Sequence, residues 1–158
     1  MQRLIAIILI TGHFLLPNPA NAAEEDDLNR LLDGFHQAAA RADYSDYFSR
    51  FSKESVFLGT DATERWTINE FKAYTKPHFA GGRGWTYIPQ QRFWRVQGDI
   101  AWFDEQLENA NLGRCRGTGV AVREDGKWKV AHYSLTMLIP NDIAGDVAAR
   151  AKQVKHEP

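Results

Sequence analysis

The second half of the chain consists of four long extended runs joined by short turns, and this pattern constrains the fold more than any other feature. The runs are Trp85 to Gln97, Ile100 to Asn109, Arg114 to Arg123 and Lys127 to Ile139. Their connections are Gly98-Asp99, Ala110 to Gly113 and Glu124-Asp-Gly126. Short connections that contain Gly and Asp are typical of antiparallel hairpins. We therefore predict a meander of long antiparallel strands.

The first half of the chain predicts helices. Glu24 to Ala42 opens with acidic residues and places apolar residues three and four positions apart, as in an amphipathic helix with one buried face. Asp43 to Asp46 predicts a break and a new helix cap. A short helix should follow, and it would carry Tyr47, Phe48 and Phe51.

A strand and a third helix are expected next. Ser55 to Thr60 predicts a strand that breaks near Gly59 and leads into a turn. Thr67 precedes Glu70 by the spacing of a capping box, which predicts a helix from Ile68 to about Phe79. Helices followed by a strand meander indicate an α+β fold. The tail, residues 142–152, is weakly helical in pattern and is expected at the periphery.

Residues 1–22 have the layout of a cleavable secretory signal. Arg3 precedes an apolar run from Leu4 to Leu16, and Ala20-Asn21-Ala22 supplies small residues for cleavage. The run is shorter than the roughly 20 residues that a membrane-spanning helix needs. We therefore expect a single domain over residues 23–158, located in a periplasm or the medium and free of the membrane after cleavage. A retained amphipathic anchor is the alternative.

The composition gives no support for nucleic acid or anionic membranes as partners, and it excludes an internal disulfide. Because 19 Lys and Arg oppose 20 Asp and Glu, nothing in the charge favours nucleic acid or an anionic membrane as a partner. Cys115 is the only cysteine, so an internal disulfide is excluded. A buried thiol, an intermolecular disulfide and a reactive thiol all remain open for Cys115. The 12% aromatic content indicates a large apolar interior or a lined cavity.

Two segments carry a family resemblance: Val56-Phe-Leu-Gly-Thr-Asp-Ala-Thr-Glu-Arg-Trp66 and Asp125-Gly-Lys-Trp-Lys-Val-Ala-His-Tyr-Ser-Leu-Thr-Met-Leu-Ile-Pro-Asn141. Both resemble the SnoaL-like branch of the nuclear transport factor 2-like superfamily, whose members have a cystatin-like α+β fold. The resemblance implies three N-terminal helices packed on a strongly curved antiparallel or mixed sheet, forming a cone with an internal pocket. It also implies a homodimer through the convex face of the sheet.

Strand alternation divides the candidate residues between two faces. The resemblance places Trp102, Asp104, Tyr133 and Leu135 on the concave, pocket-facing side. An aspartate in an aromatic pocket has a pKa raised by desolvation and can act as general acid or base. Asp104 is therefore the leading catalytic candidate, with Tyr133 beside it. The alternative is a structural ion pair of Asp104 with Arg114 or Arg116 on the adjacent strand.

The candidate ligand-binding residues are Asp61, Glu64, Trp66, Trp85, Trp102, Arg116 and Leu135. Asp61 and Glu64 have an alternative as structural residues of the turn and of the following helix start. Neither acid forms a recognised ligand pattern with His78, so we expect no metal and no cofactor. His132 is expected in the sheet or an interface, and His36 has no evident partner in the sequence.

Three functions remain open from the sequence. The first is an exported pocket domain that binds a small apolar or aromatic molecule. The second is an acid/base enzyme of the cyclase, dehydratase, isomerase or hydrolase kind that uses Asp104. The third is a dimeric interaction module. Steroid-type isomerisation is disfavoured, because rough alignment with ketosteroid isomerases places Phe35 and Gly59 where those enzymes have a tyrosine and an acid.

Overall fold

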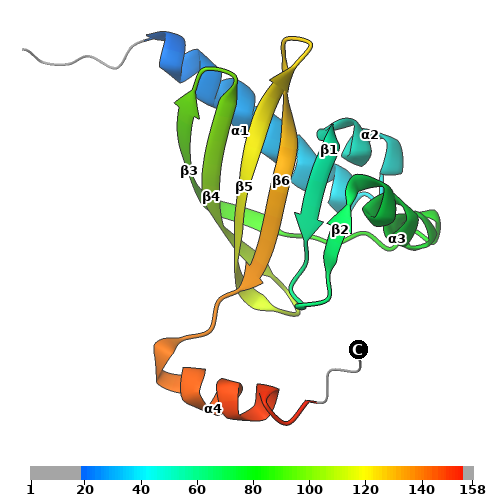
Figure 1. Cartoon of the computed structure of the whole chain (residues 1–158), viewed down its shortest axis with the longest axis vertical. Coiled ribbons are helices and arrows are strands. Elements are labelled where there is room, and N and C mark those ends of the chain that lie inside the picture. The colour runs from blue at the N-terminus through cyan, green and yellow to red at the C-terminus, as the bar shows by residue number, and fades with distance from the viewer. Residues whose placement is uncertain (1–18, 155–158) are drawn as a thin grey trace, which may run out of the picture.

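The computed structural model describes residues 19–154 and contains helices packed against one curved sheet (Figure 1). The leader expected over residues 1–22 therefore lies mostly outside the described residues. Within them, no helix combines the length and apolar character that crossing a membrane requires.

The elements follow the α+β order expected from the sequence. They are α1 (Pro19–Ala40), α2 (Tyr44–Ser49), β1 (Phe51–Leu58), β2 (Arg65–Thr67), α3 (Ile68–Ala80), β3 (Ile88–Gln97), β4 (Ile100–Asn109), β5 (Gly113–Glu124), β6 (Lys127–Met137) and α4 (Asn141–Ala151). Phe51 begins β1 and does not belong to the second helix, contrary to the prediction, because that helix ends at Ser49. The short strand β2 was not expected, since this segment was predicted as a turn.

Two side-chain caps explain where the helices begin. Asp43 accepts a hydrogen bond from the backbone N–H of Asp46 at 2.9 Å and caps α2. At the start of α3, the Thr67 hydroxyl accepts from the Glu70 backbone and the Glu70 carboxylate accepts from the Thr67 backbone. Both caps were predicted from residue spacing alone and are confirmed.

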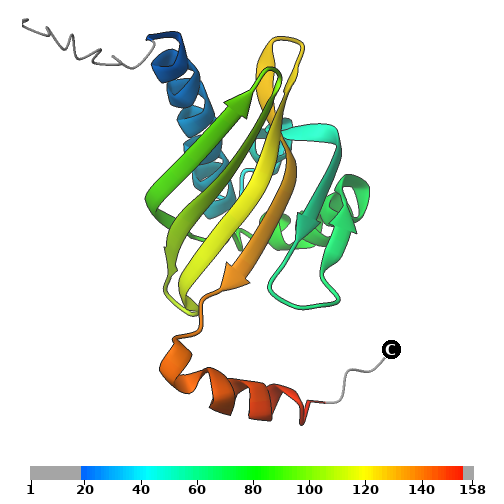
Figure 2. The same cartoon turned by 60° about the vertical axis from the view of Figure 1, so that its left-hand side comes forward.

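The six strands form one mixed sheet in the order β2-β1-β6-β5-β4-β3. β1 runs parallel to β6, and the other neighbouring pairs are antiparallel. Helices α1, α2 and α3 cover one face of this sheet, and the described residues leave its other face open (Figure 2). The curved α+β architecture that the resemblance implied is therefore confirmed.

A β-bulge sets the direction of the side chains on the last strand. Val120 pairs with His132 and Ala121 pairs with Val130, so Ala131 has no partner on β5. Because one residue is inserted, Trp128 and Val130 point inward before the bulge and Tyr133 and Leu135 point inward after it. Strict alternation along β6 would have placed these two pairs on opposite faces.

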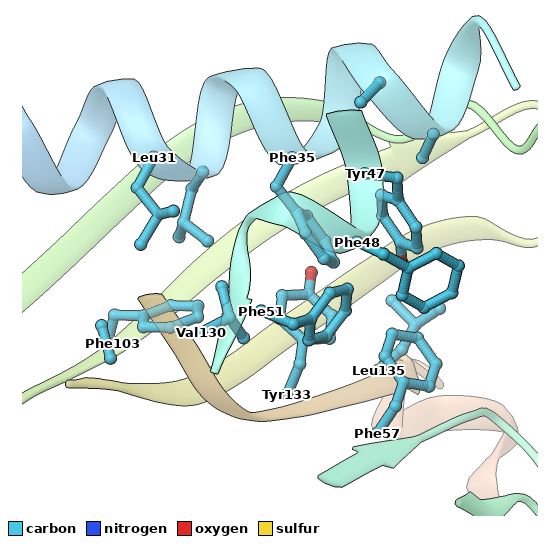
Figure 3. Packing of buried hydrophobic residues seen from close by; sticks show 14 of the residues in the cluster. Leu31, Phe35, Tyr47, Phe48, Phe51, Phe57, Phe103, Val130, Tyr133 and Leu135 are labelled. Atoms are coloured by element: carbon cyan, nitrogen blue, oxygen red, sulfur yellow. The ribbon is translucent and has the colours of Figure 1, made fainter. Parts of the chain in front are cut away.

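The core between helices and sheet is largely aromatic. Phe57 stacks on Phe71 with ring centroids 4.1 Å apart, and Phe35 lies 5.0 Å from Tyr133 across the interior. Figure 3 shows these rings meeting between α1 and the strands, with the Tyr133 hydroxyl directed toward α1. Burial of such large rings contributes a large part of the hydrophobic stabilisation of a core.

Helix α4 lies apart from this core. Both views show it beyond the end of β6, away from the sheet and the other helices (Figures 1 and 2). None of its residues is buried. The tail is therefore helical and peripheral, as its sequence predicted.

Candidate functional site

The candidate site is a cavity of about 180 Å³ between α1, α2, α3 and the strands β1, β2 and β6. Most of its wall is aromatic, and a few polar groups interrupt the rings. The lining residues are Phe35, His36, Tyr47, Phe57, Gly59, Thr60, Glu64, Trp66, Phe71, Tyr74, Trp85, Tyr87, Tyr133 and Leu135.

The order of the elements brings these rings together. Trp66 lies on β2 and stacks on Tyr74 of α3 with centroids 4.8 Å apart. Trp85, in the connection between α3 and β3, lies 4.8 Å from Phe79 and 5.9 Å from Tyr47. A tight turn after β1 and the start of α3 therefore build one wall, and the connection to β3 closes another.

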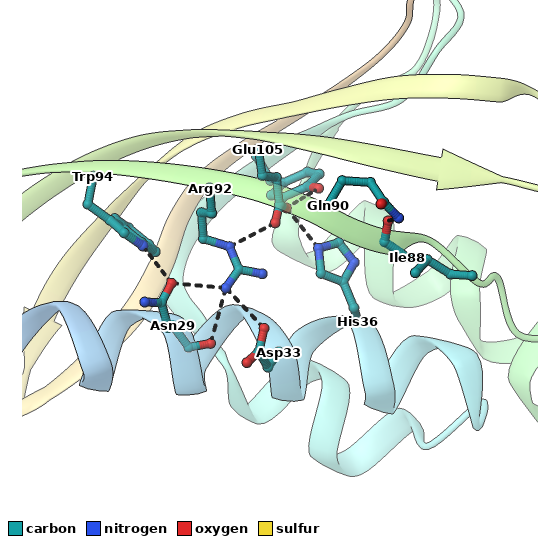
Figure 4. A network of polar contacts seen from close by, with 9 residues as sticks. Asn29, Asp33, His36, Ile88, Gln90, Arg92, Trp94 and Glu105 are labelled. Carbon is teal, nitrogen blue, oxygen red and sulfur yellow. Dashed lines mark hydrogen bonds and ion pairs between the residues drawn. The ribbon is translucent and has the colours of Figure 1, made fainter.

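A buried polar cluster lies behind the cavity, between α1 and the strands β3 and β4 (Figure 4). Glu105 has 0% exposure and is its centre. Its Oε1 is 2.7 Å from Nε2 of His36 and accepts from the Tyr133 hydroxyl at 2.8 Å. Its Oε2 accepts from Nε of Arg92 at 2.9 Å. These partners come from three elements: His36 from α1, Tyr133 from β6 and Arg92 from the neighbouring strand β3.

Arg92 connects this carboxylate to the first helix. Its second nitrogen, Nη1, donates to the side chain of Asn29 at 3.1 Å and to Asp33 at 3.0 Å. Asn29 also accepts from the Trp94 indole at 3.0 Å. A buried charge is tolerated when it is paired and hydrogen-bonded, so this cluster keeps an ionised glutamate inside the domain.

The pKa of Glu105 reflects two opposing effects. Burial would raise it, but the hydrogen bond from His36, the charges of His36 and Arg92, and the Tyr133 hydroxyl outweigh burial, so the net pKa lies below its ordinary value. Tyr133 responds in the opposite sense, because its own burial and the negative charge of Glu105 raise its pKa well above the ordinary value. Glu105 is therefore a carboxylate and Tyr133 a neutral phenol near neutral pH.

His36 and Tyr133 link the cluster to the cavity, because both line the cavity and both bond Glu105. An ionised Glu105 can only accept, so Nε2 of His36 carries the proton between them. In a neutral imidazole, Nδ1 is then the nitrogen free to accept a proton. This arrangement can orient a histidine as an acid or base beside a bound molecule.

Gly117 on β5 leaves the space that this cluster needs. A Cβ at this position would overlap the Tyr133 hydroxyl and would lie 2.9 Å from Oε1 of Glu105. The contact between Tyr133 and Glu105 therefore depends on the missing side chain.

Five predicted site residues line the cavity: Glu64, Trp66, Trp85, Tyr133 and Leu135. Asp61 is exposed in the turn after β1, where its carboxylate accepts from the backbone N–H and the hydroxyl of Thr63. It is not among the lining residues, and its bonds fit the structural alternative.

The placement of Asp104, Trp102 and Arg116 inside the pocket was wrong. Trp102 is 47% exposed, and the buried residues of β4 are Ala101, Phe103, Glu105 and Leu107. Asp104 and Trp102 therefore face outward, and Arg116 is exposed on the outer face of β5. The inward row of β4 is Ala101, Phe103, Glu105 and Leu107, so every side chain of this strand lies on the face opposite to the one that was predicted.

The structural alternative for Asp104 is not found either. Thr118 lies opposite Asp104 on β5, whereas Arg116 lies opposite Gln106. Arg114 pairs with Glu108 at 3.4 Å. No ion pair of Asp104 occurs within the part of the chain that the structure describes.

Sequence reasoning missed Glu105 and gave His36 no partner. The signal for Glu105 was present, since it shares a strand face with Ala101, Phe103 and Leu107, whereas the opposite face carries Asp104 and Gln106. A single acid on an apolar row indicates a buried, paired group. The pairing with His36 had no sequence signal, because 69 positions separate the two residues.

Cys115 lies on the inward row of β5 and is buried. Burial raises the pKa of its thiol, and the negative charge of Glu108 adds to this effect. The thiolate is therefore disfavoured, which fits a buried thiol better than a reactive one.

Among residues 19–154, no three His, Cys, Asp or Glu side chains converge as a metal site would require.

Comparison with known proteins gives one family and many related folds. The family model of the SnoaL-like domain matches residues 28–140, which is more than half of the chain. A search of curated proteins found no match.

Several solved structures are similar over most of their length. A domain of unknown function with a cystatin-like fold from Nostoc punctiforme has a TM-score of 0.68 at 15% identity, over 84% of this chain and 88% of that one. A proposed dehydratase of the NTF2-like family from Streptomyces avermitilis has a TM-score of 0.65 at 13% identity, over 78% and 100%. A proposed scytalone dehydratase from Novosphingobium aromaticivorans has a TM-score of 0.63 at 12% identity, over 77% and 88%. At these identities the likeness shows the fold alone.

Proposed function

We propose, from the premise that this chain belongs to the SnoaL-like domain family, that it binds one small apolar or aromatic molecule in the cavity between its helices and its sheet. The observation that carries this proposal is the aromatic lining of the cavity. Ligand sites are typically concave and mostly apolar, with a few placed polar groups. Here the rings form the wall, and Glu64, His36 and Tyr133 are among its polar groups.

The size of the cavity limits the ligand. Its volume is about 180 Å³, and an apolar cavity of about 150 Å³ is enough to hold a benzene molecule. A ligand of one ring, or a branched alkyl group of similar size, fits this space. Larger molecules would have to extend out of the cavity.

Tryptophan fluorescence tests this proposal, since Trp66 and Trp85 both line the cavity. Titration with benzyl alcohol should change the emission of the folded chain in a saturable way. Trp66→Leu should weaken binding about tenfold or more, because it removes one wall of the site. Trp102→Leu is the matched control, since Trp102 lies outside the cavity on the outer face of β4 and leucine keeps that face apolar. Equal weakening by both variants, or no saturation, would contradict the proposal.

A second function is supported by the bond between His36 and Glu105. As an acid/base enzyme, the protein would use Nδ1 of His36 to take a proton from a carbon of the bound molecule and return it to a departing hydroxyl, which leaves as water. Two of the similar structures described above are proposed dehydratases. His36→Gln should then abolish turnover while it preserves binding. Retained turnover would assign His36 a structural role.

Export and dimer formation complete the proposal. The secretory layout of residues 1–22 supports export, and N-terminal sequencing of the protein from culture supernatant or periplasm would test it.

The outer face of the sheet exposes Phe93, Ile100 and Trp102, at 54%, 51% and 47%. An apolar face of this kind supports a homodimer through the sheet. Trp102→Asp should then halve the mass measured by light scattering, and an unchanged mass would remove this interface.

A further inference from the structure

Glu64 places a negative charge in the wall of the cavity. Its Oε2 accepts a hydrogen bond from the backbone N–H of Asp61 at 3.2 Å, and its carboxylate lies against Gly59, another lining residue. A Cβ at residue 59 would overlap this carboxylate, so the glycine permits its position. Within residues 19–154, Glu64 takes part in none of the ion pairs of the structure.

The rest of the lining does not neutralise this charge. It contains neither Lys nor Arg, and its other polar side chains are His36, Thr60 and tyrosines. Tyr87 stays neutral, because burial, followed by the charges of Cys115 and Glu64, raises its pKa to about 12. Nε2 of His36 is hydrogen-bonded to Glu105, and the charge of Glu105 is paired with Arg92. Glu64 is therefore the acid of the cavity that has no cationic partner among the described side chains.

Aromatic walls and an unmatched carboxylate favour the same kind of ligand. Ring faces carry the negative part of the aromatic quadrupole and attract cations, most strongly when the cation is poorly hydrated. A carboxylate in a partly buried wall adds a charge that water screens incompletely. An anionic ligand would meet repulsion from both groups, and a neutral ligand would leave the carboxylate without a charge partner.

We propose that the molecule bound in this cavity is a compact organic cation, such as an alkylated ammonium group, held by the aromatic walls and by the carboxylate of Glu64. This inference rests on the proposed binding function and specifies its ligand class. A trimethylammonium group has apolar methyl surface to contact the rings and a diffuse positive charge to face Glu64. The volume of about 180 Å³ accommodates a group of this size.

Choline and its uncharged isostere 3,3-dimethyl-1-butanol separate charge from shape. Both should be titrated into the full-length folded chain, with tryptophan emission or calorimetry as the readout. We expect choline to bind about tenfold more tightly than the isostere, as a charge-assisted contact would produce. Benzyl alcohol is included as a neutral probe of the cavity itself.

Two variants locate the origin of this preference. Glu64→Gln should reduce the ratio of the two affinities to near unity, while the affinity for 3,3-dimethyl-1-butanol stays within about twofold of wild type. Glu54→Gln removes the same charge from an exposed position on β1 outside the cavity, and it should retain the wild-type ratio. Binding of the isostere by Glu64→Gln also shows that the cavity remains folded.

The outcomes distinguish a failure of the cation assignment from a failure of the binding function. Equal affinity for choline and the isostere, or a preference for the isostere, would overturn the cation assignment and leave the binding function in place. Binding by neither probe nor by benzyl alcohol would remove the binding function as well. A choline preference that survives Glu64→Gln would show that Glu64 is not its source and would overturn the assignment.

Discussion

Asp104 and Glu105 are adjacent acids on one strand, and the sheet separates their environments completely. Glu105 points inward, is fully buried and accepts hydrogen bonds from His36, Tyr133 and Arg92. Asp104 points to the outer face, opposite Thr118. The face of the strand, and not the type of residue, therefore decides whether an acid can take part in chemistry or packing.

Glu105 and Glu64, the acids beside and inside the cavity, differ in their charge partners. Glu105 is ion-paired with Arg92 and hydrogen-bonded to His36, so its charge is compensated within the protein. Glu64 lines the cavity and forms no ion pair within residues 19–154. Glu105 therefore holds and orients other side chains, and Glu64 is the acid that we propose to contact a ligand.

The largest expected difference between the two neighbouring acids is in stability. Glu105→Ala should lower the free energy of unfolding by about 3–5 kcal/mol, because His36, Tyr133 and Nε of Arg92 would all lose the buried carboxylate to which they are hydrogen-bonded. Asp104→Ala should change it by less than about 0.5 kcal/mol, as expected for a surface position. Urea denaturation of both variants measures the contrast. Similar losses in the two variants would show that the faces of β4 are assigned incorrectly.

The next largest loss of stability should come from filling the space beside Glu105. Gly117→Ala should cost about 1–3 kcal/mol, because the new Cβ would displace the Tyr133 hydroxyl from Glu105. Thr118→Ala, one residue further along β5 and on the outer face, is the control and should be nearly neutral. Thermal unfolding followed by circular dichroism compares the two. A neutral Gly117→Ala would show that the cluster rearranges freely.

A smaller effect is expected from one hydrogen bond of the cluster. Tyr133→Phe removes the hydroxyl that donates to Glu105 at 2.8 Å and preserves the ring. Because Glu105 keeps His36 and Arg92, the loss in unfolding free energy should be about 1.5 kcal/mol, the low end for a hydrogen bond to a charged group. Urea denaturation measures it. A loss as large as that of Glu105→Ala would mean that Tyr133 holds the whole cluster in place.

The smallest contrast is the pH dependence of stability. The pKa of Glu105 is lower in the folded chain than its ordinary value of 4.5, so its contribution is complete above that value and is lost as the pH falls below it toward the folded pKa. The stability advantage of wild type over Glu105→Gln should therefore shrink below about pH 4.5. Asp104→Asn shows how much of any change comes from removing a negative charge from β4. If the stability advantage of wild type over Glu105→Gln grew at acidic pH, the pKa of Glu105 would be raised in the folded chain and not lowered.

Much of this architecture was predictable because its signals are local. The apolar spacing along α1, the capping residues and the Gly-Asp turns act within a few positions, so α1, α2, α3 and the four long strands were anticipated. The predicted start of α1 at Glu24 was wrong, because the helix begins at Pro19 and its first turn holds no acidic residue. The residues of the turn before α3 were also identified, and Glu64 and Trp66 line the cavity as predicted. β2 was missed, because a strand of three residues depends on its pairing with β1.

By itself, the sequence determined the order of the main helices and long strands, the caps of α2 and α3, and the two alternating rows of side chains on β4 and β5. Only the tertiary structure decided which row faces the interior, because an alternating pattern is symmetric until helices cover one side of the sheet. The same holds for the bulge at Ala131, which turns both Val130 and Tyr133 inward. It holds as well for the meeting of His36 with Glu105, since a contact between distant segments depends on the packing of a whole helix against a whole sheet.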